Sequence, residues 1–70
     1  MKENIINKVN ELRIQKGVTQ ENIAFEVGVS RQTIVAIEKG NYRPSIILAL
    51  KLARFFDMPV EKIFKISNEK

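Results

Sequence analysis

Apolar residues recur with a helical period along most of this chain, and glycines and prolines interrupt the pattern. Ile5, Val9 and Leu12 fall at i, i+4 and i+7, which is the spacing of one helix face. Gly17 follows, and glycine commonly ends a helix in a left-handed conformation. The pattern predicts a first helix that contains these three apolar residues and ends at Gly17.

Two short helices are predicted next, each with a hydroxyl residue at its start and a glycine at its end. Thr19 and Ser30 can accept a hydrogen bond from backbone N–H groups of the following turn. Gly28 and Gly40 mark the two ends. The apolar faces consist of Ile23, Ala24 and Val27 in the first of these helices, and of Ile34, Ala36 and Ile37 in the second.

A fourth helix is predicted from about Ile46 to Phe56, after a loop at Pro44 and a capping Ser45. Apolar side chains surround this helix almost completely, so we expect it in the middle of the core and at an oligomer contact. Pro59 favours the start of a fifth short helix, Val60 to Phe64, before a polar tail. The expected fold is all-α, with five helices in a single domain over residues 1–70.

Composition narrows the chemistry. The 70 residues include no cysteine and no histidine, so we expect no disulfide, no metal site and no cofactor. No phosphate loop or dinucleotide motif is present, and the carboxylates stand singly on polar faces, so we do not expect an enzyme. Twelve Lys and Arg against eight Asp and Glu leave a net charge of +4. That excess is what binding to nucleic-acid phosphates requires.

The start of the sequence lacks the apolar segment of a secretory signal, and no run of 18 apolar residues follows. We therefore expect no contact with a membrane. The expected setting is the cytoplasm of a bacterium, or a phage, with the protein at the nucleoid if its excess positive charge serves to bind DNA.

Residues 20–39 have the pattern of two helices that cross steeply through a short turn. The close approach of such helices needs a small residue, which Ala24 supplies, and the turn needs positive φ, which Gly28 accommodates. Once the apolar residues face the core, polar side chains remain on the outer face of the second helix. These are Arg31, Gln32 and Thr33.

This arrangement resembles the helix-turn-helix of the lambdoid phage repressor and Cro proteins and of the wider Xre-like bacterial regulators. The resemblance runs almost continuously through LRIQKGVTQENIAFEVGVSRQTIVAIEKGNYRPS and covers about sixty of the seventy residues. It implies a compact lambda-repressor-like domain whose second and third helices form the DNA-binding motif. The implied activity is sequence-specific binding of double-stranded operator DNA to regulate transcription.

The resemblance also implies roles for individual residues. Arg31 and Gln32 fall where the family reads base edges, and their side chains can pair with guanine and adenine respectively. The further residues placed near bases are Ser30, Thr33 and Ala36, of which the two hydroxyls could instead cap the helix. The residues placed near DNA phosphates are Thr19, Gln20, Lys39, Asn41, Tyr42 and Arg43. Similar proteins pair the residues at Arg13 and Glu38 in a structural ion pair.

Surplus apolar residues toward the C-terminal end suggest a homodimer. They exceed what the core of so small a domain can absorb, so we expect a two-fold interface within about residues 46–66. A dimer would read two half-sites about one helical turn apart in a pseudo-palindrome. The residues expected at this interface are Ile47, Phe55, Phe56, Met58, Val60, Ile63 and Phe64. Phe25 is not explained by it.

A helix-turn-helix domain can also bind a protein, such as a toxin, in place of DNA. The presence of Arg31, Gln32 and a basic loop argues against that alternative. Repression is favoured over activation, because activation needs a surface that contacts RNA polymerase and no such surface is evident. An autonomous repressor, a phage-type immunity regulator and an antitoxin that represses its own operon stay open as roles, as do the operator, the regulated genes and the inducing signal.

Overall fold

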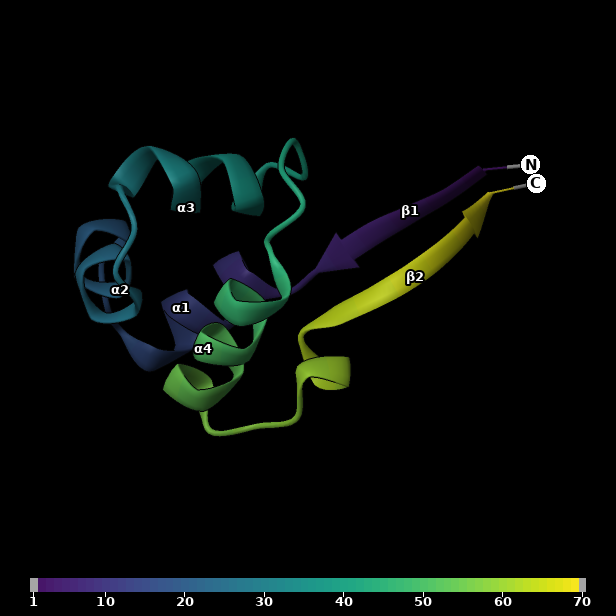
Figure 1. The fold of residues 1–70 in the computed structure, drawn as a ribbon. Helices are drawn as coiled ribbons and strands as arrows, with labels where there is room; N and C mark the ends of the chain where they lie inside the picture. Colours follow the sequence, from purple (N-terminus) through teal and green to yellow (C-terminus); the bar gives the residue numbers. More distant parts are fainter. Residues whose placement is uncertain (1, 70) are drawn as a thin grey trace.

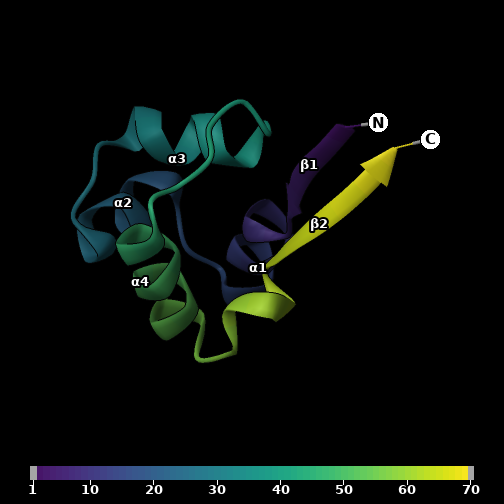
Figure 2. The ribbon, with the colours of Figure 1, turned by 45° about the vertical axis from the view of Figure 1, so that its right-hand side comes forward.

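A computed structural model describes residues 2–69 and consists of a helical body with a two-stranded ribbon (Figure 1). The elements follow in the order β1 (Lys2–Asn7), α1 (Val9–Lys16), α2 (Gln20–Val27), α3 (Arg31–Glu38), α4 (Ile46–Phe56), the 3-10 turn η1 (Val60–Lys62) and β2 (Phe64–Glu69). Strands β1 and β2 pair antiparallel, with Ile5 opposite Ile66. Figures 1 and 2 show the ribbon extending away from the helices, with both chain ends at its far tip.

Helices α2, α3 and α4 start, and helices α1 and α2 end, where local chemistry predicts. The side chains of Thr19, Ser30 and Ser45 accept hydrogen bonds from backbone N–H groups in the first turns of α2, α3 and α4. Gly17 and Gly28 end α1 and α2 in the left-handed conformation, at φ of 77° and 78°. The predicted bounds of α4 are confirmed.

The core lies where the four helices meet. Its largest fully buried side chains are Ile23, Ile34, Ile37, Leu52, Ile63 and Val9. The predicted apolar faces of α2 and α3 therefore point inward, apart from Ala36, which is only half-buried. No helix among residues 2–69 has both the length and the apolar character that crossing a bilayer would take.

The expectation that the first helix includes Ile5 is wrong. Residues 2–7 form β1 instead, and α1 begins at Val9. The helical spacing of Ile5, Val9 and Leu12 is therefore a coincidence. Residues 2–7 form a strand because they pair with β2 at the opposite end of the sequence. Pairing between such distant segments leaves no signal in a local window.

The prediction of a fifth helix over Val60 to Phe64 is also wrong. With two strands present, the fold is mostly helical and not all-α. Only Val60–Lys62 form a short 3-10 turn, and Phe64 already begins β2. The segment expected as a polar tail is thus a strand. Ile63 is fully buried between the turn and the strand, which anchors the ribbon to the core.

Candidate nucleic-acid interface

Helices α2 and α3 form the helix-turn-helix through the turn at residues 28–30. Gly28 adopts a φ of 78°, a conformation that costs a residue with a side chain more than it costs glycine. The N–H of Val29 donates to the Ala24 carbonyl over 2.9 Å, which closes the end of α2. Ala24 itself is buried. The local sequence therefore builds the turn, and the small residue predicted at the helix crossing is buried.

The N-terminal end of α3 presents Arg31 and Gln32 to solvent. Both side chains are exposed, and among the described residues neither forms a hydrogen bond or an ion pair. A guanidinium and a carboxamide are the groups best suited to bidentate hydrogen bonds with guanine and adenine in the major groove. This end of the helix is thus available for a partner.

The hydroxyl residues beside them are engaged with the helix itself. Ser30 Oγ accepts from the Thr33 N–H over 3.2 Å, and the two hydroxyl oxygens lie 3.1 Å apart. Their first task in the free protein is therefore capping. Ala36 lies one turn further along and is half-buried, so it offers at most part of a methyl surface.

The Gln20 side chain does not point freely outward, as a direct phosphate contact would require. Its Nε2 donates to Glu38 Oε1 over 3.0 Å, which draws the half-buried side chain toward the end of α3. Thr19 likewise caps α2 by accepting from the Asn22 N–H over 2.9 Å. The backbone N–H groups that open α2 remain the anion-attracting feature of this end.

The loop after α3 is polar and exposed. It contains Lys39, Asn41, Tyr42 and Arg43, all of which are exposed. The N–H of Asn41 donates to the Ala36 carbonyl over 2.9 Å, and Gly40 has a φ of 81°, so the loop turns tightly away from α3. The two cations flank the exposed helix on its C-terminal side.

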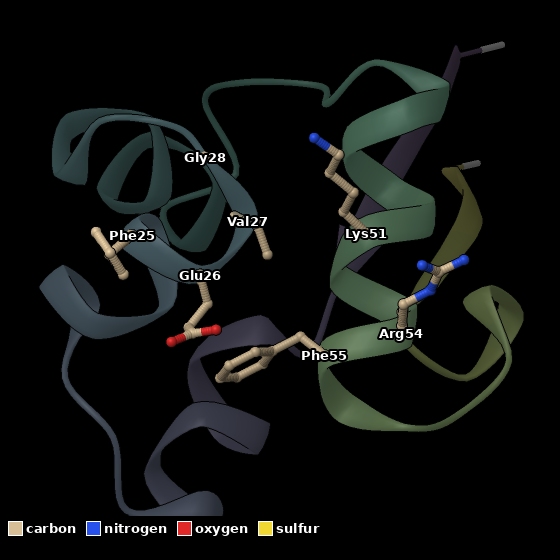
Figure 3. A pocket seen from close by; sticks show the side chains of 7 residues that line it. All are labelled: Phe25, Glu26, Val27, Gly28, Lys51, Arg54 and Phe55. Atoms are coloured by element: carbon tan, nitrogen blue, oxygen red, sulfur yellow. The ribbon is translucent and has the colours of Figure 1, made fainter.

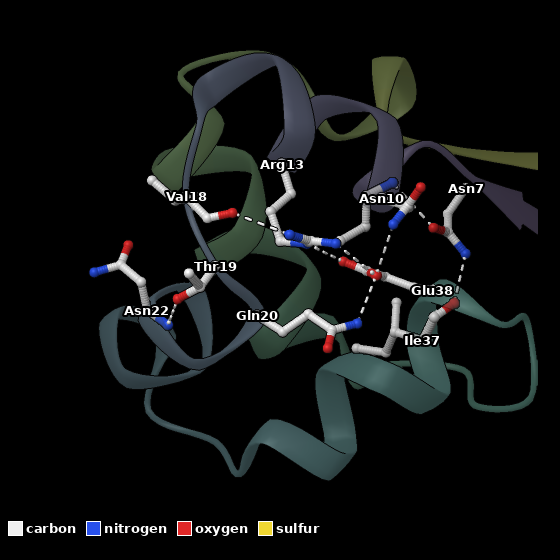
Figure 4. A network of polar contacts seen from close by, with 10 residues as sticks. Asn7, Asn10, Arg13, Val18, Thr19, Gln20, Asn22, Ile37 and Glu38 are labelled. Carbon is white, nitrogen blue, oxygen red and sulfur yellow. Dashed lines mark hydrogen bonds and ion pairs between the residues drawn. The ribbon is translucent and has the colours of Figure 1, made fainter.

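The C-terminal end of α3 is held by a polar cluster centred on Glu38 (Figure 4). Arg13 Nε donates to Glu38 Oε2 over 2.7 Å, so the pair that the family resemblance implied is present. Glu38 Oε1 also accepts from Asn10 and Gln20, each over 3.0 Å. The two charged side chains are 14% and 5% exposed, so this ion pair is shielded from water. Three elements thereby meet at one carboxylate.

Electrostatics at Glu38 favour the charged form. Burial by itself raises the pKa of this carboxyl, but hydrogen bonds from Arg13, Gln20 and Asn10, with the positive charge of Arg13, outweigh burial. The pKa therefore lies below its ordinary value of 4.5. The carboxylate stays ionised at neutral pH and keeps its donors in place.

Sequence reasoning missed two asparagines in this region. Asn10 bonds to Glu38, and Asn7 Nδ2 donates to the Ile37 carbonyl over 2.9 Å. Both are ordinary polar residues near a helix start, and only the fold brings them to the end of α3. No local pattern in the sequence distinguishes these two asparagines from other polar residues, because their partners lie about 30 positions away.

Most residues expected at a dimer interface pack within the protomer. Phe56 and Ile63 belong to its core and have almost no surface left for a partner, so their assignment is wrong. The expected surplus was absorbed because η1 and the residues on either side of it pack against the core. The half-buried residues packed against the core are Phe55, Met58, Val60 and Phe64. Ile47 alone of the seven is strongly exposed, at 64%.

A hollow of about 400 Å³ lies between α2 and α4 (Figure 3). Phe55 points across it toward Glu26 on α2, and Lys51 and Arg54 line the α4 side. Phe25 lies at its edge and is 81% exposed, which nothing in the structure explains. Among residues 4–67, whose side chains the structure describes, no cluster of three or more Asp or Glu side chains is arranged to hold a metal ion.

Comparison with known proteins agrees with this geometry. Residues 9–63 match the profile of a family described as helix-turn-helix. The chain is 51% identical over 63 residues to the HTH-type transcriptional regulator YgzD of Bacillus subtilis (strain 168), covering 90% of this chain and 96% of that one. It is 33% identical over 57 residues to the cryptic phage CTXphi transcriptional repressor RstR of Vibrio cholerae, covering 81% of this chain and 51% of RstR.

Solved structures have the same fold. The restriction-modification controller protein C.AhdI from Aeromonas hydrophila superposes with a TM-score of 0.73 at 34% identity, over 79% of this chain and 83% of that one. A protein from Bacteroides fragilis superposes with a TM-score of 0.79 over 87% of this chain and 98% of that one, and at 20% identity it shows the fold alone. The chain belongs to the Xre-like, lambda-repressor-related helix-turn-helix family of DNA-binding transcriptional regulators.

Proposed function

We propose that this regulator is a repressor that binds a pseudo-palindromic operator as a homodimer, with Arg31 and Gln32 reading base edges. The observation that carries the proposal is the contrast in α3, whose N-terminal side chains are exposed and unbonded while its other end is tied to the body. A rigid helix with free donors at one end suits direct readout in the major groove. Ser30, Thr33 and Ala36 are proposed as weaker neighbours of the bases.

Phosphate contacts fix the helix on the duplex in this proposal. Lys39 and Arg43 provide the charge, and Asn41 and Tyr42 provide hydrogen-bonding groups. The opening of α2 at Thr19 and Gln20 contributes backbone N–H groups, with the Gln20 side chain acting chiefly through Glu38. Affinity is expected to fall steeply with salt, because each neutralised phosphate releases counterions.

The proposed dimer surface is the outer face of α4. Ile46, Ile47 and Leu50 are 80%, 64% and 55% exposed, and Leu50 lies about one helical turn after the two adjacent isoleucines. Three large apolar side chains together on one surface favour a partner. A two-fold contact there would give each operator half-site its own α3. Repression is supported by the similarity to RstR, which is itself a phage repressor.

The test of base reading is Arg31→Ala against Arg54→Ala. Both changes remove one exposed arginine, so they lower the net charge equally, but Arg54 lies on α4 beside the hollow. Operator sequences are first selected from random DNA. We expect Arg31→Ala to weaken operator binding by roughly ten- to a hundredfold at constant salt, with no change in melting temperature. Equal losses from both variants, or failure of random DNA to yield any preferred sequence, would contradict the proposal.

The test of the dimer is Ile47→Glu against Ile14→Glu. The two isoleucines are similarly exposed, at 64% and 62%, but Ile14 lies on α1 in a different hollow. Sedimentation equilibrium is expected to show a dimer for the wild type and for Ile14→Glu, and a monomer for Ile47→Glu. A wild-type protein that stays monomeric in the presence of operator DNA would rule out the homodimer.

A further inference from the structure

Asn7 is a single side chain that bridges the ribbon, α1 and the DNA-reading helix. It ends β1, where its backbone pairs with Phe64 at the start of β2. Its Oδ1 accepts from the Val9 N–H over 3.0 Å, and its Nδ2 donates to the Ile37 carbonyl over 2.9 Å. The half-buried carboxamide therefore uses both of its polar atoms.

The carbonyl that Asn7 binds lies in the last turn of α3. The Ile37 carbonyl also accepts from the Gly40 N–H over 3.0 Å, so two donors from different parts of the chain converge on it. Carbonyls in this turn have no partner within their own helix. Asn7 thus supplies a side-chain cap from a residue 30 positions away, and this cap sets where the end of α3 lies relative to β1.

The base of the ribbon, next to Asn7, is itself anchored to the core. The Lys8 N–H donates to the Ile63 carbonyl over 2.9 Å, and Ile63 is fully buried. The base of the ribbon cannot shift without moving core residues. The Glu38 cluster ties α3 to α1 and α2, whereas Asn7 alone among these polar contacts ties α3 to the paired chain ends.

We infer that Asn7 is a positioning residue for operator discrimination. The inference rests on the proposed function, in which the opposite end of α3 reads bases. Reading groups must be held to about 0.5 Å, because bidentate hydrogen bonds weaken steeply with misalignment. A shift at one end of so short a helix is transmitted to the other end. Asn7 therefore acts on specificity while lying away from Arg31 and Gln32.

The test uses Asn7→Asp and Asn7→Ser against the same changes at Asn4. Asp and Ser retain an oxygen that can accept from the N–H two residues on, so α1 keeps its start. Neither can replace the bond to Ile37, because the carboxylate has no proton to donate to a carbonyl and the serine side chain is too short. Asn4 is an exposed asparagine on the same strand, and its side chain forms no hydrogen bond among the described residues. Affinities for the selected operator and for an unrelated duplex are measured at one salt concentration, after circular dichroism has shown each variant to be folded.

We expect both Asn7 variants to lower the ratio of operator affinity to unrelated-duplex affinity by about tenfold, since one misaligned base contact accounts for such a factor. The Asn4 variants are expected to leave this ratio unchanged. The inference is overturned if folded Asn7→Ser has the wild-type ratio of operator to unrelated-duplex affinity. The uncharged serine variant decides the test if the aspartate variant does not fold. If Arg31→Ala also leaves the ratio unchanged, the proposed function has failed, and not the role of Asn7 alone.

Discussion

The two ends of α3 are built on opposite principles. At the C-terminal end, Glu38 accepts hydrogen bonds from Arg13, Asn10 and Gln20, and the carboxylate is almost fully shielded from water. At the N-terminal end, Arg31 and Gln32 are exposed and make no such bonds within residues 2–69. One helix of eight residues thus carries a shielded carboxylate with several donors at one end and exposed donors without a partner among the described residues at the other.

This contrast shows how a small protein can present flexible polar side chains with little loss of precision. Arginine and glutamine have long side chains, and their reach is useful only if the backbone that carries them is fixed. Fixing the distant end leaves the reading end unobstructed. In the proposed mode of binding, specificity then depends also on residues that never touch the DNA.

The largest expected effect comes from removing the fixed end. Glu38→Ala leaves the guanidinium of Arg13 partly buried without its partner, and we expect a loss of roughly 3–5 kcal/mol in the free energy of unfolding. Urea denaturation at pH 7 measures this loss. Glu26→Ala, which removes an exposed carboxylate from α2, is expected to change stability by no more than about 0.5 kcal/mol. Equal effects would mean that the Glu38 cluster does not fix the helix.

Acid should weaken the same end to a smaller extent. The pKa of Glu38 is lower in the folded protein than its ordinary value of 4.5, so the unfolded state binds a proton more readily. The stability from this carboxylate is therefore complete above that ordinary value and is lost as the pH falls through the folded pKa. Urea midpoints of the wild type and of Glu38→Gln are expected to converge as the pH falls from 7 to about 2. A gap that stays constant with pH would contradict a lowered pKa.

Substitutions at the N-terminal end of α3 should lower the affinity for operator DNA without lowering the stability of the protein. Gln32→Ala removes a carboxamide suited to adenine, and we expect operator binding to weaken by about 1–3 kcal/mol. The melting temperature is expected to stay unchanged, because the side chain is exposed. Gln15→Ala, at an exposed glutamine of α1, provides the control. A fall in melting temperature specific to Gln32→Ala would show that the two ends are less distinct than the structure indicates.

The smallest effect is expected at Ser30, which caps the N-terminus of α3. Ser30→Ala removes the oxygen that accepts from the Thr33 N–H, at a cost of about 1 kcal/mol in stability. Ser45→Ala removes the equivalent bond to the Leu48 N–H of α4 and should cost a similar amount. Thermal unfolding measures both losses. Only Ser30→Ala is expected to weaken operator binding as well, because only α3 carries the reading residues.

Prediction from the sequence succeeded where the cause is local. The caps at Thr19, Ser30 and Ser45 and the left-handed glycines at Gly17 and Gly28 act within one or two turns of the chain. It failed for β1 and β2, which stabilise each other from the two ends of the sequence. It also did not foresee the partner of the Gln20 side chain, which donates to Glu38 in the folded protein.

The sequence alone determined the helix-turn-helix, since periodicity, capping groups and a glycine turn are short-range properties that the residues carry with them. The tertiary structure decided which polar groups meet: the approach of Asn7, Asn10 and Gln20 to the end of α3 depends on how separate helices and strands pack. Burial strengthens such contacts, and burial is a property of the whole fold. The exposed end of α3 could therefore be read from the chain, and the fixed end could not.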